Sequence, residues 1–257
     1  MSISESKIVD FRNFINNFYV KNRRAFSWRD DISPYRVFVS EIMLQQTQTS
    51  RVEQKFEPFI KAFPSFQRLT TASLSEILRY WQGLGYNRRS LALHKGARII
   101  MDRYAGILPS DPGLLVALPG IGPATAASMV TFAYNKATVF IETNIRSVLL
   151  HHFFPNKSNV TDKQLLPIVE QVLDKERPRD WYYALMDYGV MLKKQYVNPS
   201  RASAHYVTQK SFKGSNREIR GMILRYLTQQ GFCSQRDLEK EIPSTWDCVQ
   251  KNLHAFE

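Results

Sequence analysis

The sequence predicts an all-α protein, and three observations support this fold class. Apolar side chains recur at helical spacing along most of the chain. Alternating apolar and polar residues, which mark a half-buried strand, are almost absent. Serine and proline stand at the starts of several periodic segments, where they can cap or open a helix. The 257 residues are 44% hydrophobic, enough for one large domain or for one domain with a small appendage.

The expected helices follow one another with short connections. The first covers residues 5–22 and has Phe11 on its apolar face. Ser33 and Pro34 provide the N-cap and first turn of the second, which carries Glu41. Further helices are expected at residues 52–62, 73–81, 88–104, 111–117, 123–134, 144–153, 161–174 and 179–193.

Residues 215–257 are expected to form a separate small helical module. Start signals at Ser215, Ser234 and Pro243 predict three short helices. Three short helices joined by tight turns are typical of a helix-turn-helix or winged-helix module, and equally of a plain packing appendage. The chain ends at Glu257, before a wing hairpin could form, so a winged-helix module would be truncated.

The formal net charge of +12 favours an anionic partner, either nucleic acid or an acidic membrane. The one long uncharged stretch, residues 113–135, contains Pro119 and Pro123 and is a poor membrane span. The two cysteines, Cys233 and Cys248, fit neither a metal-ligand spacing nor a disulfide framework. We therefore expect no metal site, no membrane and a cytoplasmic location.

Leu118 to Gly122 reads Leu-Pro-Gly-Ile-Gly and lies between two expected helices. Gly120 and Gly122 allow unusual backbone angles and close approach of another backbone. Pro123 opens the next helix, whose free N–H groups and dipole suit an anion such as a DNA phosphate. The alternative is an ordinary turn between helices.

Glu41 is the most informative carboxylate. Its neighbours three and four residues away include Val37, Phe38 and Leu44, and no Lys or Arg lies between Val37 and Ser50. An unpaired carboxylate on an apolar face is expected to have a raised pKa, as a general acid requires. The alternative is that Glu41 pairs with an arginine distant in the sequence.

Five segments occur in an order that resembles the helix-hairpin-helix superfamily of DNA glycosylases. They are most like MutY-type adenine DNA glycosylases and, more loosely, endonuclease III. The resemblance covers roughly residues 8–192, and the segments are Trp28-Arg29, Pro34-Tyr35, Ser40 to Gln48, Gly83 to Tyr86, and Leu118 to Gly122.

The resemblance implies a two-lobed, all-helical fold with a cleft for a flipped nucleotide. The glycosylase domain would cover residues 1–214. Its central lobe would be about residues 28–135, and its second lobe would combine residues 1–27 with 136–214. The module at residues 215–257 would be an appendage, similar to a helix-turn-helix.

The resemblance also implies roles for matching positions. Glu41 would protonate the departing base, while Gln46 and Tyr86 would wedge into the duplex. The base pocket would contain Trp28, Arg29, Tyr183 and Asn144. As alternatives, Trp28 could be a core residue and Tyr86 a turn residue.

The departures from the family pattern are equally informative. Glu142 replaces an aspartate; it could still stabilise a developing sugar cation, or it could be a surface acid at a helix start. Ala124 stands where bifunctional relatives carry a lysine, so a Schiff-base lyase step is not expected. Residues 193–214 contain no cysteine, so the family's iron–sulfur cluster is not expected, although the hairpin could hold a monovalent cation. A basic segment, residues 193–225, stands in place of the cluster loop and is either a DNA contact or a solvated charge run.

We therefore expect a monomeric, monofunctional DNA glycosylase acting on double-stranded DNA, with adenine in a mismatch as the favoured target. One alternative is a glycosylase for another mismatched, deaminated or damaged base. A second, of a different class, is a non-catalytic DNA-binding protein. The residues expected to bind DNA phosphates are Gly120, Gly122, Ala124, Thr125, Arg88, Arg89, Lys193, Lys194, Lys210 and Lys213.

Overall fold

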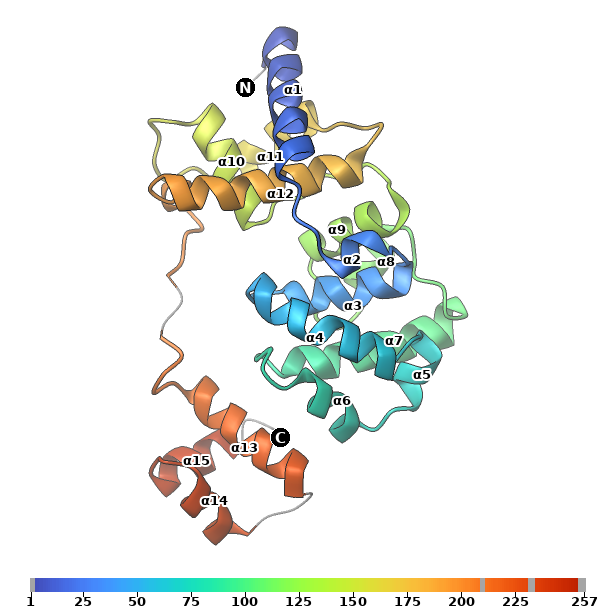
Figure 1. The fold of residues 1–257 in the computed structure, drawn as a ribbon, viewed down its shortest axis with the longest axis vertical. Helices are drawn as coiled ribbons and strands as arrows, with labels where there is room; N and C mark the ends of the chain where they lie inside the picture. Colours follow the sequence, from blue (N-terminus) through green and yellow to red (C-terminus); the bar gives the residue numbers. More distant parts are fainter. Residues whose placement is uncertain (1–2, 209–210, 231–233, 254–257) are drawn as a thin grey trace. The chain divides into compact units, whose positions relative to one another are not determined.

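The structure is a computed structural model, and it describes residues 3–208, 211–230 and 234–253. Within these ranges every regular element is a helix, and the only β-type pairing is one isolated bridge between Val160 and Ser203. The all-α class expected from the sequence is confirmed (Figure 1). The chain divides into two compact units, which are described separately below.

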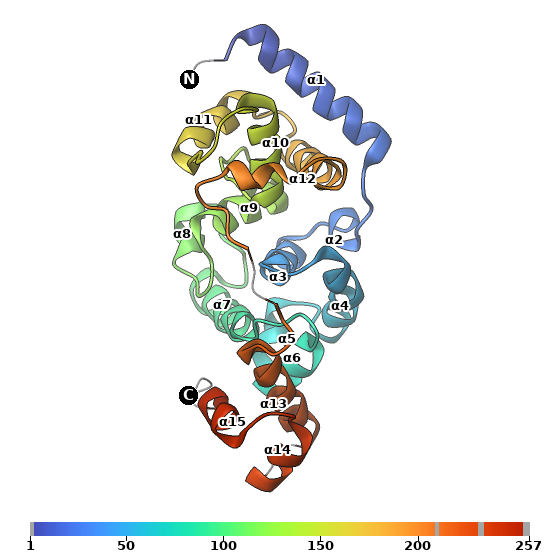
Figure 2. The same cartoon turned by 90° about the vertical axis from the view of Figure 1, so that its left-hand side faces the viewer.

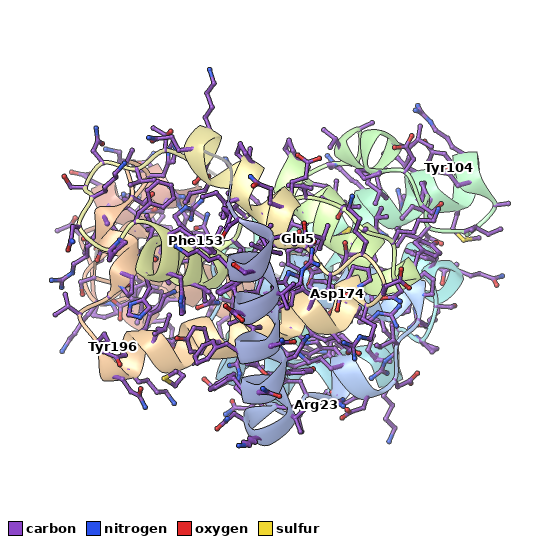
Figure 3. The ribbon with its side chains drawn as sticks, turned by 90° about the horizontal axis from the view of Figure 1, so that it is seen from above. Glu5, Arg23, Tyr104, Phe153, Asp174 and Tyr196 are labelled. Atoms are coloured by element: carbon purple, nitrogen blue, oxygen red, sulfur yellow. The ribbon has the colours of Figure 1, made fainter. Side chains whose placement is uncertain are left out.

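Unit 1 comprises residues 1–41, 108–117 and 121–208. Helix α12 packs against both α10 and α1. Figure 3, in which Glu5 and Arg23 mark the two ends of α1, shows this helix crossing α12. The helices of unit 1 are α1 (Glu5–Asn22), α2 (Ser27–Asp30), most of α3 (Pro34–Leu44), α8 (Pro112–Val116), α9 (Pro123–Tyr134), α10 (Thr143–Phe153), α11 (Asp162–Val172), α12 (Pro178–Gln195) and the 3₁₀ helix η1 (Pro199–Ala202).

The contact between α10 and α12 depends on Gly189. A Cβ atom at this position would lie 2.5 Å from the backbone oxygen of Asn144 and 2.8 Å from its Cβ. Real side chains do not reach such distances, so only glycine lets α12 come this close to the first turn of α10. This approach fixes the position of Asn144, which was expected to line the base pocket.

Unit 2 comprises residues 42–107, 118–120 and 209–257. Besides the end of α3 it contains α4 (Thr49–Ala62), α5 (Phe66–Thr71), α6 (Leu74–Trp81), α7 (Arg88–Tyr104), α13 (Asn216–Gln230), α14 (Gln235–Glu241) and α15 (Trp246–Leu253). Figure 2 gives a second view of these helices. Trp81 and Phe59 are fully buried and meet edge to face, with ring centroids 6.2 Å apart.

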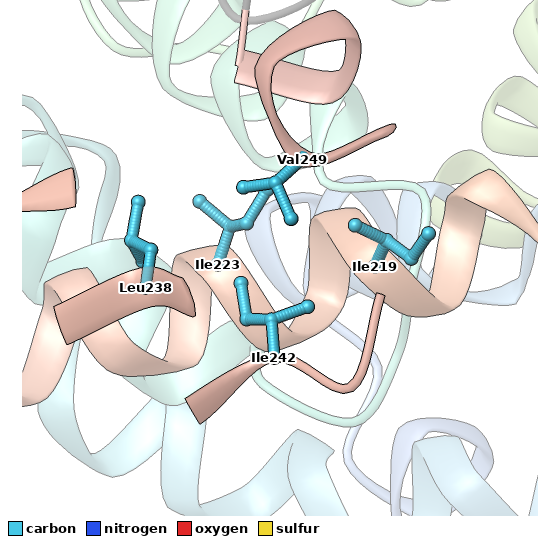
Figure 4. Packing of buried hydrophobic residues seen from close by; sticks show 5 residues of the cluster. All are labelled: Ile219, Ile223, Leu238, Ile242 and Val249. Carbon is cyan, nitrogen blue, oxygen red and sulfur yellow. The ribbon is translucent and has the colours of Figure 1, made fainter. Parts of the chain in front are cut away.

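The last three helices, α13 to α15, share a small core of their own, which is drawn in Figure 4. α13 also packs against α6, so this C-terminal module contacts the rest of unit 2. The residues of the small core are Ile219, Ile223, Leu238, Ile242 and Val249.

Two of the predicted helix starts are confirmed. Ser33 Oγ accepts a hydrogen bond from the Arg36 N–H at 3.2 Å. Ser234 and Asp237 form a complete capping box at the start of α14. The start expected at Ser215 is confirmed in position, because α13 begins at Asn216, but the Ser215 hydroxyl donates to the backbone oxygen of Phe212.

The short helices α2 and α5 were not predicted. Units 1 and 2 are compact parts of the fold and do not coincide with the two lobes expected above, whose boundaries stay a prediction. In the parts of the chain that the structure describes, no helix combines the length and the hydrophobicity needed to cross a membrane.

Candidate active site and DNA-contacting residues

Glu41 lies near the end of α3 and is only partly exposed. Its carboxylate oxygen Oε2 accepts a hydrogen bond from the hydroxyl of Ser128, on α9. Burial raises the pKa of Glu41 from its ordinary value of 4.5 to about 7. The Ser128 hydrogen bond opposes this shift, the charge of Glu142 adds to it, and the charge of Arg29 opposes it. The raised pKa expected for Glu41 is confirmed.

Arg29, the cation whose charge acts on Glu41, forms an ion pair with another carboxylate, that of Asp187. Its two terminal nitrogens donate to the oxygens of Asp187 at 3.0 and 3.1 Å. Arg24 donates to the same carboxylate from Nε at 2.7 Å, and Asp187 is only 3% exposed. Among the described residues Glu41 forms no ion pair, so the alternative of a distant arginine partner is not supported.

Glu142 is the N-cap of α10. Its Oε1 accepts from the backbone N–H groups of Asn144 at 2.8 Å and Ile145 at 2.9 Å, and its Oε2 accepts from the Asn144 side chain at 3.1 Å. These bonds fix the carboxylate where its charge acts on Glu41. Glu142 is thus a helix-start acid, and it also lies in the electrostatic environment of the expected catalytic acid.

Lys193 joins the same group. Its Nζ donates to Oδ1 of Asn144 at 2.9 Å. Burial lowers the pKa of Lys193 below its usual value, and the charge of Glu142 partly restores it. The structure therefore places Lys193 in the electrostatic environment of Glu142, and its ammonium group already has a protein partner in Asn144.

The expected base-pocket residues Trp28, Arg29 and Tyr183 are all buried. The Arg29 guanidinium lies 4.3 Å from the centre of the Tyr183 ring, and Trp28 stacks on Phe26 at 4.6 Å. Arg29 and Tyr183 both interact electrostatically with Glu41. The structure thus brings Arg29 and Tyr183 together with the acid, while Trp28 lies in an aromatic stack.

The hairpin has an unusual backbone at one of its two glycines, Gly120, whereas Gly122 is extended, with a φ of −87°. Gly120 has a φ of +73°, and a Cβ there would lie 2.9 Å from the Cβ of Ala92. Gly122 is the N-cap of α9 and has no side chain to cap the first N–H groups. Gly122 and Ala124 are exposed and Thr125 is partly exposed, so the start of α9 is open to solvent.

Gln46 and Tyr86, the expected wedge residues, both have left-handed backbones, with φ of 52° and 48°. Non-glycine residues rarely adopt this conformation, and such strain often marks functional loops. Gln46 is exposed, whereas the Tyr86 hydroxyl accepts a hydrogen bond from Arg217 of α13 at 3.0 Å. The C-terminal module therefore contacts the loop that carries one of the two wedge residues.

Arg89 forms several hydrogen bonds within unit 2. Its guanidinium donates to Oγ1 of Thr47 at 2.8 Å and to five backbone oxygens. Burial lowers the pKa of Arg89 to about 10, which leaves it charged at neutral pH. The five oxygens belong to Ile42, Met43, Gln45, Leu84 and Gly85. These bonds connect the end of α3 to the loop before α7 and favour a structural role for Arg89 over phosphate binding.

The remaining basic positions differ in exposure. Arg88, Lys194 and Lys213 are exposed, as a phosphate contact requires. Lys210 lies outside the described residues.

The described residues offer no group of three His, Cys, Asp or Glu side chains that could hold a metal ion. The segment that would correspond to the family's cluster loop begins with Lys193 and Lys194 and contains no cysteine. Its donor chemistry does not fit an iron–sulfur cluster, which is held by thiolates.

Sequence reasoning missed Ser128, Asp187 and Gly189. Asp187 is the acceptor for two arginines, and Gly189 sets the α10–α12 contact. A signal was present for Ser128, because it follows Thr125 by three residues on the helix that the hairpin opens.

Comparison with known proteins identifies the family. Residues 39–174 match the family described as "HhH-GPD superfamily base excision DNA repair protein". The adenine DNA glycosylase of Buchnera aphidicola subsp. Baizongia pistaciae (strain Bp) is 32% identical over 186 residues, 72% of this chain and 53% of that protein. The adenine DNA glycosylase of Homo sapiens is 28% identical over 255 residues, 95% of this chain and 46% of that protein. The chain thus spans about half the length of these curated relatives.

Solved structures share the fold. A thermostable thymine-DNA glycosylase superposes with a TM-score of 0.65 at 25% identity, covering 72% of this chain and 87% of that one. A non-covalent endonuclease III–DNA complex gives 0.58 at 15% identity, covering 74% and 86%, which shows the fold alone. The family match spans more than half of the sequence, and the chain belongs to the HhH-GPD superfamily of base excision DNA repair proteins.

Proposed function

We propose that this protein is a monofunctional DNA glycosylase that removes adenine from a mismatch in double-stranded DNA. The observation that carries the proposal is the raised pKa of Glu41, about 7, to which the charge of a second carboxylate, Glu142, contributes. A carboxyl group with this pKa can hold a proton near neutral pH and release it to a substrate. Paired carboxyl groups are the common means of hydrolysing a glycosidic bond.

In the proposed reaction, neutral Glu41 donates its proton to a nitrogen of the flipped base. The bond between that base and the sugar C1′ breaks, and its electron pair leaves with the base. The negative charge of Glu142 stabilises the positive charge that develops on the sugar. Water then attacks C1′, loses a proton to solvent or to Glu41, and leaves an abasic site.

Adenine is the favoured base because the curated relatives are named adenine DNA glycosylases. A second candidate is a mispaired pyrimidine, since a thymine-DNA glycosylase is similar in structure at 25% identity. Arg29 and Tyr183 lie together and interact electrostatically with Glu41, so we expect them to distinguish the two bases.

The absence of a lyase step is part of the proposal. Ala124 has no amine, and the Lys193 ammonium is engaged with Asn144. Strand cleavage should therefore need added alkali or heat. A borohydride-trapped covalent adduct at high yield would contradict this part of the proposal.

The whole proposal is tested with a panel of duplexes, each carrying one mispaired or altered base. Formation of abasic sites is measured under single-turnover conditions. We expect release of adenine from one or more mismatches. If the protein binds these duplexes and releases no base from any of them, it is a non-catalytic DNA-binding protein and the proposal is wrong.

A further inference from the structure

Ser128 has a buried side chain on α9, with 4% of the residue exposed. Its hydroxyl lies within hydrogen-bond distance of two acceptors, Oε2 of Glu41 and the backbone oxygen of Thr125, which is 3.0 Å away. A serine hydroxyl has one proton to donate and lone pairs with which to accept. It can therefore serve only one of these acceptors fully at a time.

The two hydrogen bonds correspond to the two protonation states of Glu41. When Glu41 is neutral, its own O–H can donate to Ser128 Oγ while Ser128 donates to Thr125. When Glu41 is charged, the Ser128 hydroxyl can turn and donate to the carboxylate. When the Ser128 hydroxyl turns away, the Thr125 carbonyl still has a hydrogen-bond donor, because a helical carbonyl also accepts from the N–H four residues further on.

We propose that Ser128 is a positioning residue for the catalytic acid, a role that rests on the proposed function. The O–H of neutral Glu41 turns from Ser128 Oγ to the base nitrogen. As its proton leaves, the Ser128 hydroxyl turns from Thr125 to Glu41 and stabilises the carboxylate as the charge forms. Ser128 keeps its own proton throughout; the proton that reaches the base comes from Glu41.

Other groups act on Glu41 without taking over this task. The charge of Arg29, on α2, favours the carboxylate, and the charge of Glu142, at the start of α10, disfavours it. Tyr183, on α12, has a pKa raised by burial and stays neutral. Among the described residues, Ser128 is the one hydrogen-bond partner of the Glu41 side chain. Removing its hydroxyl therefore isolates a single contribution.

The test compares Ser128→Ala with a matched control, Ser90→Ala. Ser90 is also fully buried on a helix, and its hydroxyl donates to a backbone oxygen three residues earlier, that of Asn87, at 2.7 Å. Ser90 has no carboxylate partner. Both variants lose one buried hydroxyl of the same kind, so a difference between them reports on Glu41.

The first measurement is the titration midpoint of the Glu41 carboxyl carbon by ¹³C NMR, assigned with Glu41→Gln. Without the Ser128 donor the carboxylate is harder to form, so Ser128→Ala should raise the midpoint by about one pH unit or more. Ser90→Ala should leave it unchanged, and Ser128→Thr should restore it. An unchanged midpoint in Ser128→Ala overturns the proposal, whether or not the protein excises any base. If the alanine variant does not fold, Ser128→Cys takes its place, because a thiol is a weak donor.

The second measurement is the single-turnover rate of base release against pH. Ser128→Ala should lose roughly 10- to 100-fold at neutral pH, the range for a hydrogen bond to a charged group. Its decline at alkaline pH should also begin at a higher pH than in the wild type. A rate profile equal to that of the wild type overturns the proposal. If the wild type releases no base at all, the proposed function fails, and the NMR titration still decides the role of Ser128.

Discussion

Glu41 and Arg89 are both ionisable side chains held mostly inside the protein, and their surroundings differ sharply. Arg89 donates hydrogen bonds to five backbone oxygens and to Thr47 Oγ1. Glu41 has a single hydrogen-bond partner among the described residues, Ser128. Arg89 remains charged at neutral pH, whereas the pKa of Glu41 is raised to about 7.

The difference distinguishes a structural charge from a reactive one. A buried charge whose terminal nitrogens donate to many oxygens stabilises the loops around it and stays in one protonation state at neutral pH, even though Nε of Arg89 has no partner among the described residues. A buried carboxyl group with one neutral hydrogen-bond partner is costly to ionise, so it can hold or release a proton near neutral pH. Substitutions at Glu41, Glu142 and Gly189 test the reactive charge, and a substitution at Arg89 tests the structural one.

The largest effect is expected from Glu41→Gln. The amide cannot donate the catalytic proton, so base release should fall by at least roughly three orders of magnitude. Duplex affinity should stay within about threefold, since Glu41 does not attract DNA. The check is single-turnover excision alongside an equilibrium binding assay, and wild-type turnover by the variant would remove Glu41 from the mechanism.

Glu41→Gln should also change how the free energy of unfolding depends on pH. Folded Glu41 binds its proton more tightly than an unfolded glutamate, so the free energy of unfolding should fall as pH rises from about 4.5 to about 7. The contribution is at most about 3 kcal/mol, and partial exposure of Glu41 reduces it. In Glu41→Gln this part of the pH dependence should be flat in urea titrations.

Glu142 is expected to have the next largest effect. Glu142→Gln keeps an oxygen for the helix cap but loses the charge, so excision should fall by roughly two to three orders of magnitude. Glu142→Asp keeps the charge and is itself a good N-cap, so it should retain more than a tenth of the wild-type rate. Equal rates for Glu142→Gln and the wild type would show that Glu142 is only a cap.

Substitution of Gly189 tests the packing of α10 against α12, which positions Asn144. A Cβ at this site would meet the Asn144 backbone at 2.5 Å, so Gly189→Ala should push α10 and α12 apart and lower excision roughly 10- to 100-fold. The matched control is Gly221→Ala, in helix α13, where a Cβ meets nothing within 4 Å. The control should be neutral or stabilising by up to about 1 kcal/mol. Equal behaviour of the two variants would show that the α10–α12 contact is not critical.

Arg89 should affect stability more than chemistry. Lysine cannot reproduce the forked hydrogen bonds, so Arg89→Lys should lower the free energy of unfolding by roughly 2–4 kcal/mol. The exposed neighbour Arg88 gives the control, and Arg88→Lys should change it by less than about 0.5 kcal/mol. The single-turnover rate of folded Arg89→Lys should change only a few-fold. A large loss of rate with unchanged stability would reverse the roles assigned to Arg89 and Glu41.

Much of the fold could be predicted from the sequence because helix signals are local. The first helix was predicted at residues 5–22 and is observed at Glu5–Asn22. Short helices carry too few turns to show a period, and α2 has only four residues. The left-handed backbones of Gln46 and Tyr86 were not predicted either, because neither residue is a glycine.

The site was predictable to the extent that it depends on near neighbours. The raised pKa of Glu41 followed from its apolar helix face and the missing local cation. Its partner Ser128 is 87 residues away, and Asp187 is 158 residues from Arg29. Only the folded chain brings these pairs together. It also brings the Lys193 ammonium to Asn144, while the phosphate contact expected of Lys193 stays a prediction.

The central claim is that Glu41 is a neutral acid near pH 7 and delivers the proton that releases the base. It is tested most directly by the single-turnover excision rate of the wild-type protein as a function of pH. The neutral fraction of Glu41 falls as pH rises through its pKa of about 7, so the rate should drop toward tenfold per pH unit above that value. A rate that stays constant or rises between pH 7 and about pH 9 would contradict the claim, because the group required would then be ionised.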